Sequence, residues 1–368
     1  MSTTKFDITI DARMINHSGI GTYIKNLIPN LADHYKLAVL GNKNILATFI
    51  WAKKVKIVDA NYPIYSISEQ INLPKDIPYC RIFISPHYNI PIARILADKR
   101  MVVVHDVNHL VDFNKISFFK KIYARYMISA AVKKSDKVLT DSNFSKSEIS
   151  KYIIANSKEI KIVHCSIDGE QIVASLNIYF LALIKNKYRL PQNYFLYVGS
   201  IKRHKNLLSV LKAFKILKDK HSNFQLVLIG LKYNEFLSES DFEGLRENVF
   251  VPGFIPDEDL PGFYANALSL VFSSYYEGFG LPPLEAMSCG CPVLSSNASS
   301  LPEVCGDAAL YFNPYKVDEI VTAMQKIIED KNIAKDMIVK GNENIKRFSR
   351  SIFNENIKKE IDELIFSK

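Results

Sequence analysis

The chain of 368 residues lacks an apolar run long enough to cross a bilayer. Its longest such run, Ile172 to Ile184, has polar breaks and falls short of the roughly 18–20 residues that a spanning helix needs. The N-terminal stretch MSTTKFDITI lacks the basic start and apolar core of a secretory signal. These absences predict a cytoplasmic protein that at most rests on the inner face of the membrane.

Cysteine is also scarce. The five cysteines form an odd set, which argues against a disulfide framework and for a reducing compartment. Cys289, Cys291 and Cys305 lie near one another in sequence, but no histidine stands at ligand spacing, so we expect small buried side chains and no metal. Nucleic-acid motifs are missing as well, so the net charge of +9 favours an anionic substrate or an anionic surface.

What is present is the composition of a globular protein, 48% hydrophobic and 23% charged, over a length that accommodates two domains. Strand and helix patterns alternate through both halves, which predicts two α/β domains with parallel sheets. We place them at residues 1–180 and 181–350, followed by a charged amphipathic helix over about 351–368. We interpret residues 169–192 as a connector and the acidic run Asp257–Asp259 as helix capping.

The most informative stretch carries two carboxylates, Glu277 and Glu285, eight positions apart. Pro282–Pro283 between them forbid one continuous helix, so Glu277 is predicted on a loop and the helix is predicted to start near Pro283. A glycine-bearing loop that feeds a helix N-terminus forms an anion site. Glu277 would then face hydroxyl groups attached to a phosphate, and Glu285 would take a vicinal diol. The alternative is a buried helix–loop–strand unit in which the two acids have no binding role, because such a unit can have the same spacing.

The first strand, Phe6 to Ile10, leads into a glycine loop with Gly19 and Gly21 and then a helix. The dinucleotide fingerprint needs a third glycine where Ile24 stands, so a nicotinamide dehydrogenase is disfavoured. A tight turn between strand and helix would need the same two glycines.

Polar residues follow two further strands. Met101 to Val104 ends in His105 and Asp106, at the carboxyl edge where open α/β sheets place ligands. Tyr194 to Val198 is followed by Gly199 and the basic cluster Lys202–Lys205, just ahead of a helix that starts near Asn206. Cations at a helix N-terminus oppose its dipole, so this cluster makes sense if an anion lies between them.

The run EGFGLPPLEAMSCGCPV, followed by SSLPEVCGDAA, resembles the E-x7-E signature of retaining glycosyltransferases of family 4. That family has the GT-B architecture, an α/β fold of two facing Rossmann-like parallel-sheet domains with the donor site in the cleft. The stretches GIGTY, SPHYNIP, HDVNH and TDSNFSKSEI are most similar to its mannosyltransferase-like branch. The resemblance implies transfer of a hexose, mannose from GDP-mannose, to a glycan or lipid-linked acceptor of a bacterial surface polysaccharide such as O-antigen. It implies no cofactor and no metal. It also implies that the last helix packs on the N-terminal, acceptor-side domain.

The resemblance also assigns roles. Glu277 holds the donor sugar and Glu285 the ribose, His105 lies beside the sugar, and Asp106 orients the imidazole or meets the acceptor. Lys205 contacts the donor diphosphate, and Arg203 supplies a second cation because Ser200 replaces the arginine of many members. Catalytic roles thus fall on His105, Asp106, Lys205 and Glu277, and donor-binding roles on Gly19, Gly21, Gly199, Arg203, Lys205, Phe254, Gly278, Phe279, Gly280, Leu281 and Glu285.

The segment 116–137 is amphipathic at helical spacing and rich in lysine. It fits either a helix packed on the sheet with a solvated basic face or a helix that contacts anionic lipids. Three functions besides GDP-mannose transfer stay open: transfer from a UDP-sugar, epimerisation of a nucleotide-sugar by the same fold, and non-catalytic binding of a nucleotide-sugar.

Overall fold

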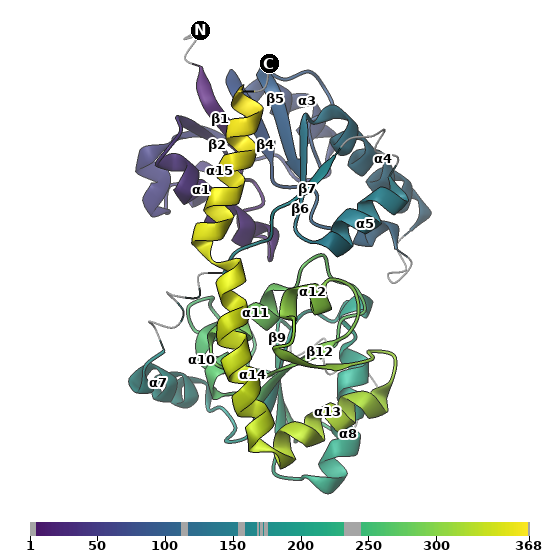
Figure 1. The fold of residues 1–368 in the computed structure, drawn as a ribbon. Coiled ribbons are helices and arrows are strands. Elements are labelled where there is room, and N and C mark those ends of the chain that lie inside the picture. Colours follow the sequence, from purple (N-terminus) through teal and green to yellow (C-terminus); the bar gives the residue numbers. More distant parts are fainter. Residues whose placement is uncertain are drawn as a thin grey trace. The chain divides into compact units, whose positions relative to one another are not determined.

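The computed structural model describes residues 5–111, 117–153, 159–167, 169, 172, 176–231 and 244–366. These residues form two compact units, unit 1 with Met1–Ser166 and Arg350–Lys368, and unit 2 with Ile167–Ser349 (Figure 1). The division follows Ser166, soon after the last strand of the first sheet, whereas the sequence placed it at residue 180. No helix in the described part of the chain is long and apolar enough to cross a membrane.

Unit 1 contains a seven-stranded parallel sheet in the order β3-β2-β1-β4-β5-β6-β7. The chain adds β2 and β3 on one side of β1 and then crosses to β4 on the other, so the order reverses between β1 and β4. The strands are β1 Phe6–Asp11, β2 Leu37–Gly41, β3 Lys56–Asp59, β4 Cys80–Ser85, β5 Ala97–Val103, β6 Lys137–Thr140 and β7 Ile160–Ile162.

The helices of unit 1 begin at recognisable caps. Ser66 and Ser142 each accept a backbone N–H through the side chain, from Glu69 and Ser145 respectively. The α-helices are α1 Ile20–Ala32, α2 Lys43–Leu46, α3 Ile67–Asp76, α4 Phe118–Lys134, α5 Asn143–Tyr152 and α15 Arg350–Phe366, with 3-10 turns η1 Ile50–Lys54 and η2 Asn108–Leu110.

The last helix, α15, belongs to unit 1 and lies beside α1 (Figure 1). The ring of Phe353 meets the edge of Tyr23 with ring centres 5.3 Å apart. The hydroxyl of Tyr35 donates to Asp362 at 2.6 Å, and Lys137 bonds to Glu360 at 2.6 Å. Apolar packing and ion pairs therefore fasten the end of the chain to the first sheet.

Unit 2 contains a six-stranded parallel sheet in the order β10-β9-β8-β11-β12-β13, which reverses between β8 and β11. Its strands are β8 Tyr194–Val198, β9 Gln225–Ile229, β10 Val249–Phe250, β11 Ser269–Phe272, β12 Val293–Ser296 and β13 Ala309–Phe312. Its helical segments are α7 Ile178–Tyr188, η3 Arg203–Lys205, α8 Leu207–Lys220, α10 Leu260–Asn266, α11 Leu281–Ser288, α12 Leu301–Cys305, α13 Val317–Glu329, α14 Lys331–Asn344 and η5 Ile345–Phe348.

The predicted fold class, two Rossmann-like parallel-sheet units, is confirmed. The central strands read as nearly continuous apolar runs because helices bury both faces of the sheet. The core of unit 2 accordingly contains β8 and β9 together with the inner sides of α8 and α13.

Two local predictions were wrong. The connector 169–192 contains helix α7, whose cap Asn177 accepts the N–H of Phe180. Asp259 does stand at the N-cap position of α10, but its carboxylate does not cap the helix and accepts instead from Lys187 and from the Tyr188 hydroxyl, each at 2.6 Å. Both differences have one cause, because α7 packs on α10 and brings its last turn to Asp259.

The contact of Phe353 with Tyr23 should account for much of the attachment of α15. We expect Phe353→Ala to lower the free energy of unfolding by about 3–4 kcal/mol, because the buried ring leaves a cavity. The matched control is Phe366→Ala on the same helix, which is 75% exposed and should change stability by less than about 0.5 kcal/mol. Denaturant unfolding of both variants measures this, and equal losses would contradict it.

Candidate active site

In unit 2, two opposite charges meet where the strand order reverses. Lys205 lies at the end of η3 after β8, and Glu277 lies on the loop after β11. The Lys205 ammonium bonds to a Glu277 carboxylate oxygen at 2.6 Å, and both side chains are mostly buried. A crevice at this point of an open parallel sheet is where such folds bind ligands.

The two loops are also joined by hydrogen bonds from side chains to backbone carbonyls. Asn206 adopts a left-handed conformation with φ 55° and donates its amide to the carbonyls of Ser273 and Pro314 at 3.1 and 2.9 Å. The hydroxyl of Ser273 donates back to the carbonyl of Lys205 at 3.1 Å. The position of Lys205 relative to β11 is thus fixed by hydrogen bonds that do not involve its own side chain.

The glycine-bearing loop after Glu277 is held from one side by two serines. The Ser300 hydroxyl lies 3.0 Å from the carbonyl of Glu277 and 2.7 Å from that of Phe279, and Ser299 accepts the N–H of Glu277. Gly280 has φ 109°, and an added Cβ would lie 2.8 Å from the Leu301 side chain. Conformation and space both require glycine here.

Gly280 is also the N-cap residue of α11 and, as a glycine, has no side chain that could cap the helix. The helix begins at Leu281, two residues before the predicted start, with prolines in its first turn as predicted. Its first N–H groups therefore supply donors and positive potential for an anion. Gly278, Phe279, Gly280 and Leu281 all belong to this loop and helix start.

Glu285 lies in the second turn of α11. Burial raises the pKa of Glu285, and the hydroxyl of Tyr264 opposes this by donating to the carboxylate at 2.8 Å. Tyr264 comes from α10 and was not singled out by the sequence, since nothing in its surroundings reveals which acid it contacts.

The remaining predicted donor residues are dispersed. Gly199 lies close to Gly230, whose φ is 92° and where an added Cβ would lie 2.7 Å from the Gly199 carbonyl oxygen. Arg203 is exposed on η3, and Phe254 is exposed on the loop after β10. In unit 1, Gly21 is required by the fold itself, because an added Cβ would lie 2.3 Å from the Ile15 carbonyl oxygen. Gly19 has φ 75° and open space beside it. Their binding roles stay predictions.

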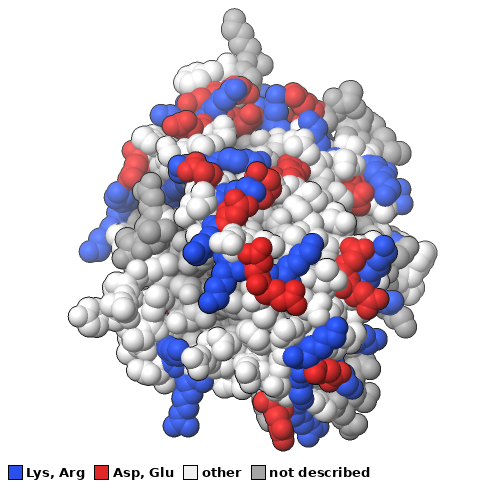
Figure 2. All heavy atoms as spheres, turned by 60° about the horizontal axis from the view of Figure 1, so that its bottom comes forward, with Lys and Arg blue, Asp and Glu red and all other residues white. Residues whose placement is uncertain are grey.

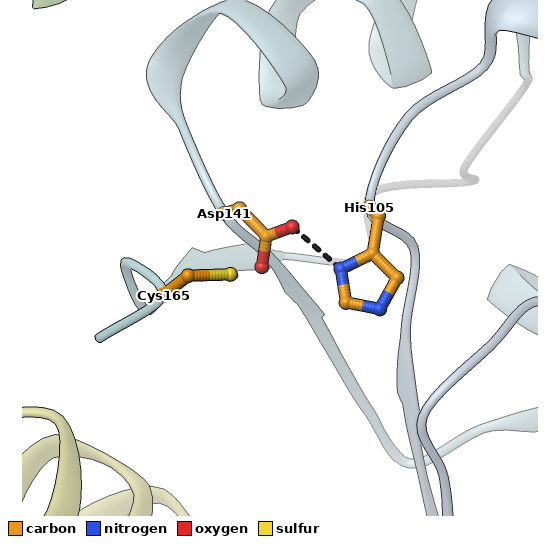
Figure 3. Close-up of side chains that lie close together, drawn as sticks. All are labelled: His105, Asp141 and Cys165. Carbon is orange, nitrogen blue, oxygen red and sulfur yellow. Dashed lines mark hydrogen bonds and ion pairs between the residues drawn. The ribbon is translucent and has the colours of Figure 1, made fainter. Parts of the chain in front are cut away.

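His105 is held at both ring nitrogens, and Figure 3 shows the bond to Asp141. Its Nδ1 lies 2.5 Å from the Asp141 carboxylate, and its Nε2 lies 2.9 Å from the Pro86 carbonyl oxygen. A carbonyl only accepts, so Nε2 carries a proton, and the carboxylate favours a second proton on Nδ1. Although burial disfavours the charged ring, Asp141 raises the pKa of His105 above its usual value. The geometry describes an imidazolium rather than a base.

One proposed role of Asp106 therefore needs correction. The imidazole of His105 is bonded to Asp141 and not to Asp106. The carboxylate of Asp106 instead accepts the backbone N–H of Asn108 at 2.8 Å. A signal for Asp141 is present in the sequence, because this acid directly follows the apolar run of β6, just as His105 follows the apolar run Met101–Val104.

Cys165 completes the group shown in Figure 3. The ligand-type atoms of His105, Asp141 and Cys165 lie within 4.8 Å of one another, which makes them the one such trio of His, Cys, Asp or Glu among the described residues. Burial raises the pKa of the Cys165 thiol well above its usual value, so it is a poor thiolate ligand. Cys289, Cys291 and Cys305 are buried thiols, as expected.

Two Rossmann-like parallel-sheet units in one chain are the architecture of the GT-B class of glycosyltransferase folds. HepE from Anabaena, solved with UDP and glucose, shares this fold at a TM-score of 0.77, with 15% identity over 97% of this chain and 99% of that one.

Sequence comparison adds the family. Residues 183–344 match the family described as Glycosyl transferases group 1. O-antigen chain mannosyltransferase B of Escherichia coli is 33% identical over 276 residues, which cover 73% of this chain and 70% of that protein. The serotype-specific mannosyltransferase WbdA of Escherichia coli is 30% identical over 281 residues, 72% of this chain but only 34% of WbdA. The chain belongs to the glycosyl transferase group 1 family and is a glycosyltransferase.

The Asp141 contact generates a prediction for His105. We expect Asp141→Asn to lower the pKa of His105 by about one unit or more, because the opposite charge is lost while the shape is kept. The stabilisation from a raised histidine pKa is present at low pH and disappears as the pH rises through the folded-state value, so the variant should lose stability mainly on the acid side. Histidine NMR titration measures the pKa. Asp106→Asn is the matched control and should shift it less; equal shifts would contradict the assignment.

Proposed function

We propose that this glycosyltransferase moves mannose from GDP-mannose to a glycan or lipid-linked saccharide in O-antigen synthesis. The relatives that cover nearly three quarters of the chain are named as mannosyltransferases, one of them of the O-antigen chain. The single structural observation that carries the proposal is the contact of Lys205 with Glu277 at the switch point of unit 2.

The site offers complementary groups for a nucleotide-sugar. Lys205 and the N–H groups at the start of α11 suit the diphosphate, and the carboxylate of Glu277 suits sugar hydroxyls. On binding, a phosphate of the donor would replace Glu277 as the partner of the Lys205 ammonium. The carboxylate of Glu277 would then accept hydrogen bonds from the sugar hydroxyls. Glu285 would hold the ribose diol, with Tyr264 fixing its orientation.

The same groups suit the chemical step that the family resemblance implies. A retaining transfer in which the departing diphosphate accepts the proton of the incoming hydroxyl needs stabilisation of negative charge on the leaving group. Lys205 and the positive end of α11 provide it in a partly buried setting, where such charges act strongly. His105, bonded at both ring nitrogens, would act through its positive charge and not as a general base. We expect no metal ion and no cofactor.

A UDP-sugar is the second candidate donor, because HepE, which shares the fold, was solved with UDP and glucose. Thermal unfolding with GDP, UDP and dTDP, with and without Mg²⁺, separates the two. A ligand at a hundred times its Kd stabilises the folded state by about 2.7 kcal/mol. We expect a metal-independent shift with GDP. A shift with UDP alone would mean that the donor is a UDP-sugar and not GDP-mannose. No shift with any of the nucleotides would refute the assignment of a nucleotide site.

Replacement of Glu277 tests the catalytic assignment. We expect Glu277→Gln to reduce the turnover of GDP-mannose by about 100-fold or more, because a neutral amide cannot make charge-assisted bonds to the sugar. Thermal unfolding should show that the protein remains folded. The matched control is Glu343→Gln, an exposed acid of the same unit, which should leave turnover unchanged. Retained turnover in Glu277→Gln would refute the role.

For the acceptor side we propose contact with an anionic membrane through α4, at the inner face of the cytoplasmic membrane. Met127, Ile128 and Val132 pack inward, whereas Phe118 and Phe119 are 72% and 81% exposed beside the exposed Lys120. Aromatic and basic side chains together suit the interface of an anionic bilayer. Figure 2 shows positive and negative side chains interspersed on the face that it draws.

Vesicle flotation tests this contact. We expect the protein to float with phosphatidylglycerol-containing vesicles more than with pure phosphatidylcholine vesicles. The double change Phe118→Ser with Phe119→Ser should weaken binding by about ten-fold or more, because two rings no longer enter the interface. Phe366→Ser removes an equally exposed ring from α15 and should have no effect. Equal losses in the two variants would exclude α4 as the contact.

A further inference from the structure

Unit 1 has its own switch point, between β1 and β4, and a small pocket lies there. Its walls come from the ends of β1 and β4 with the segments that follow them, from α1, and from α3 with the segment before it. The residues that carry its chemistry are Asp11, Arg13, Glu69, Ser85, His87 and Asn89. None of them has a part in the donor chemistry proposed for unit 2, although the position is the one where parallel sheets bind ligands.

The centre of the pocket is a buried charge cluster. Arg13 Nη2 bonds to Asp11 and to Glu69, each at 2.6 Å, and Arg13 Nε bonds to the second Asp11 oxygen at 2.8 Å. The other Glu69 oxygen accepts from Asn89 at 2.6 Å and from the backbone N–H of Tyr65 at 2.8 Å. Two carboxylates face one guanidinium, so the cluster carries one net negative charge.

One donor of this cluster has no acceptor. Arg13 Nη1 is buried, in a side chain that is only 4% exposed, and no described residue accepts its hydrogens. A buried donor without a partner is costly and needs an explanation. The space inside the pocket is about 10 Å³, which is enough for one hydroxyl group or one water molecule.

The charge decides what kind of oxygen suits this donor. A phosphate or carboxylate would meet the net negative charge of Asp11 and Glu69 at close range. A neutral hydroxyl can accept from Arg13 Nη1 and donate to a carboxylate oxygen, which satisfies both sides. His87 adds no positive charge, because burial lowers the pKa of its imidazole well below the usual value.

An aromatic rim stands beside the pocket. Tyr65 is 44% exposed, and its φ of 64° is unusual for a bulky residue. Its hydroxyl lies 3.2 Å from His87 Nε2, and its ring meets the edge of Tyr123, with ring centres 6.4 Å apart. The hydroxyl of Tyr123 in turn donates to Asn89 at 3.0 Å. A strained backbone therefore holds an exposed aromatic ring beside the hydroxyl-sized pocket.

We propose that the pocket of Asp11, Arg13 and Glu69, with Tyr65 at its rim, is a saccharide subsite that selects an uncharged sugar unit of the acceptor and rejects uronic acids and phosphorylated sugars. One sugar hydroxyl enters the pocket, and the apolar face of the ring packs on Tyr65. The inference rests on the proposed function, since it takes the acceptor to be a saccharide.

The test is an NMR titration of the full chain with two methyl glycosides that differ only at C6, methyl α-D-mannopyranoside and its uronic acid. We expect the neutral glycoside to bind and the uronate to bind at least about ten-fold more weakly, since like charges face each other in the complex. Tyr65→Gly relieves the strained backbone and removes the ring. It should weaken binding of the neutral glycoside by about five-fold. Inorganic phosphate should not compete.

Two further variants place the site. Arg13→Lys keeps the buried charge but removes Nη1, so it should weaken the neutral glycoside as well. Glu343→Gln, an exposed acid of unit 2, is the matched control and should leave glycoside binding unchanged. Uronate binding as tight as that of the neutral glycoside, or unchanged binding in both Tyr65→Gly and Arg13→Lys, would overturn the proposal. So would the lack of saturable binding at about 0.1 M glycoside, where even a very weak complex would form.

Nucleotide binding on the same samples separates this inference from the proposed function. Glycoside binding that follows the predicted pattern without any response to GDP or UDP would keep the subsite and refute the donor site. A nucleotide response without the pattern in the glycosides would refute the subsite alone.

Discussion

The parallel pairing of the strands is the constraint on which the chemistry of this protein depends. A parallel sheet covered by helices buries both faces, so polar side chains can gather only at the ends of its strands. In unit 2 the reversal of strand order at the neighbouring strands β8 and β11 brings Lys205 to Glu277. In unit 1 the reversal at β1 and β4 brings Arg13 to the segment that contains His87. Both places arise from one topological feature, the reversal of strand order.

Three cationic side chains at the ends of the strands, Arg13, His105 and Lys205, differ in how firmly their partners hold them. Arg13 is enclosed by two carboxylates, and His105 is bonded at both ring nitrogens, so neither can leave without a large cost. Lys205 has one carboxylate partner and retains some exposure. Of the three cations, Lys205 is therefore the one that could exchange its carboxylate partner for a phosphate. An enzyme that binds and releases a diphosphate requires such an exchange.

Much of this arrangement could be predicted from the sequence, because its signals are local. Prolines and glycines between Glu277 and Glu285 predicted a loop followed by a helix, and the structure places Gly280 at φ 109° directly before α11. Apolar runs predicted the strands, and the odd cysteine count predicted thiols, which are buried. The failures involve residues far apart in sequence. Asp259 contacts Lys187 and Tyr188 of a helix that was interpreted as a connector, and Asp141 replaces Asp106 as the partner of His105.

The sequence by itself determined the class of fold, the positions of the polar residues at strand ends and the family to which the chain belongs. Only the tertiary structure decided which of those residues pair. Glu285 is bonded to Tyr264, and Glu69 reaches Arg13 over 56 positions, because the register of neighbouring strands and the packing of helices on them select the contacts. Periodicity and turn residues act over a few positions and specify an element. The choice of partners between elements is made by burial, where each charged or polar group must find a bond within the folded core.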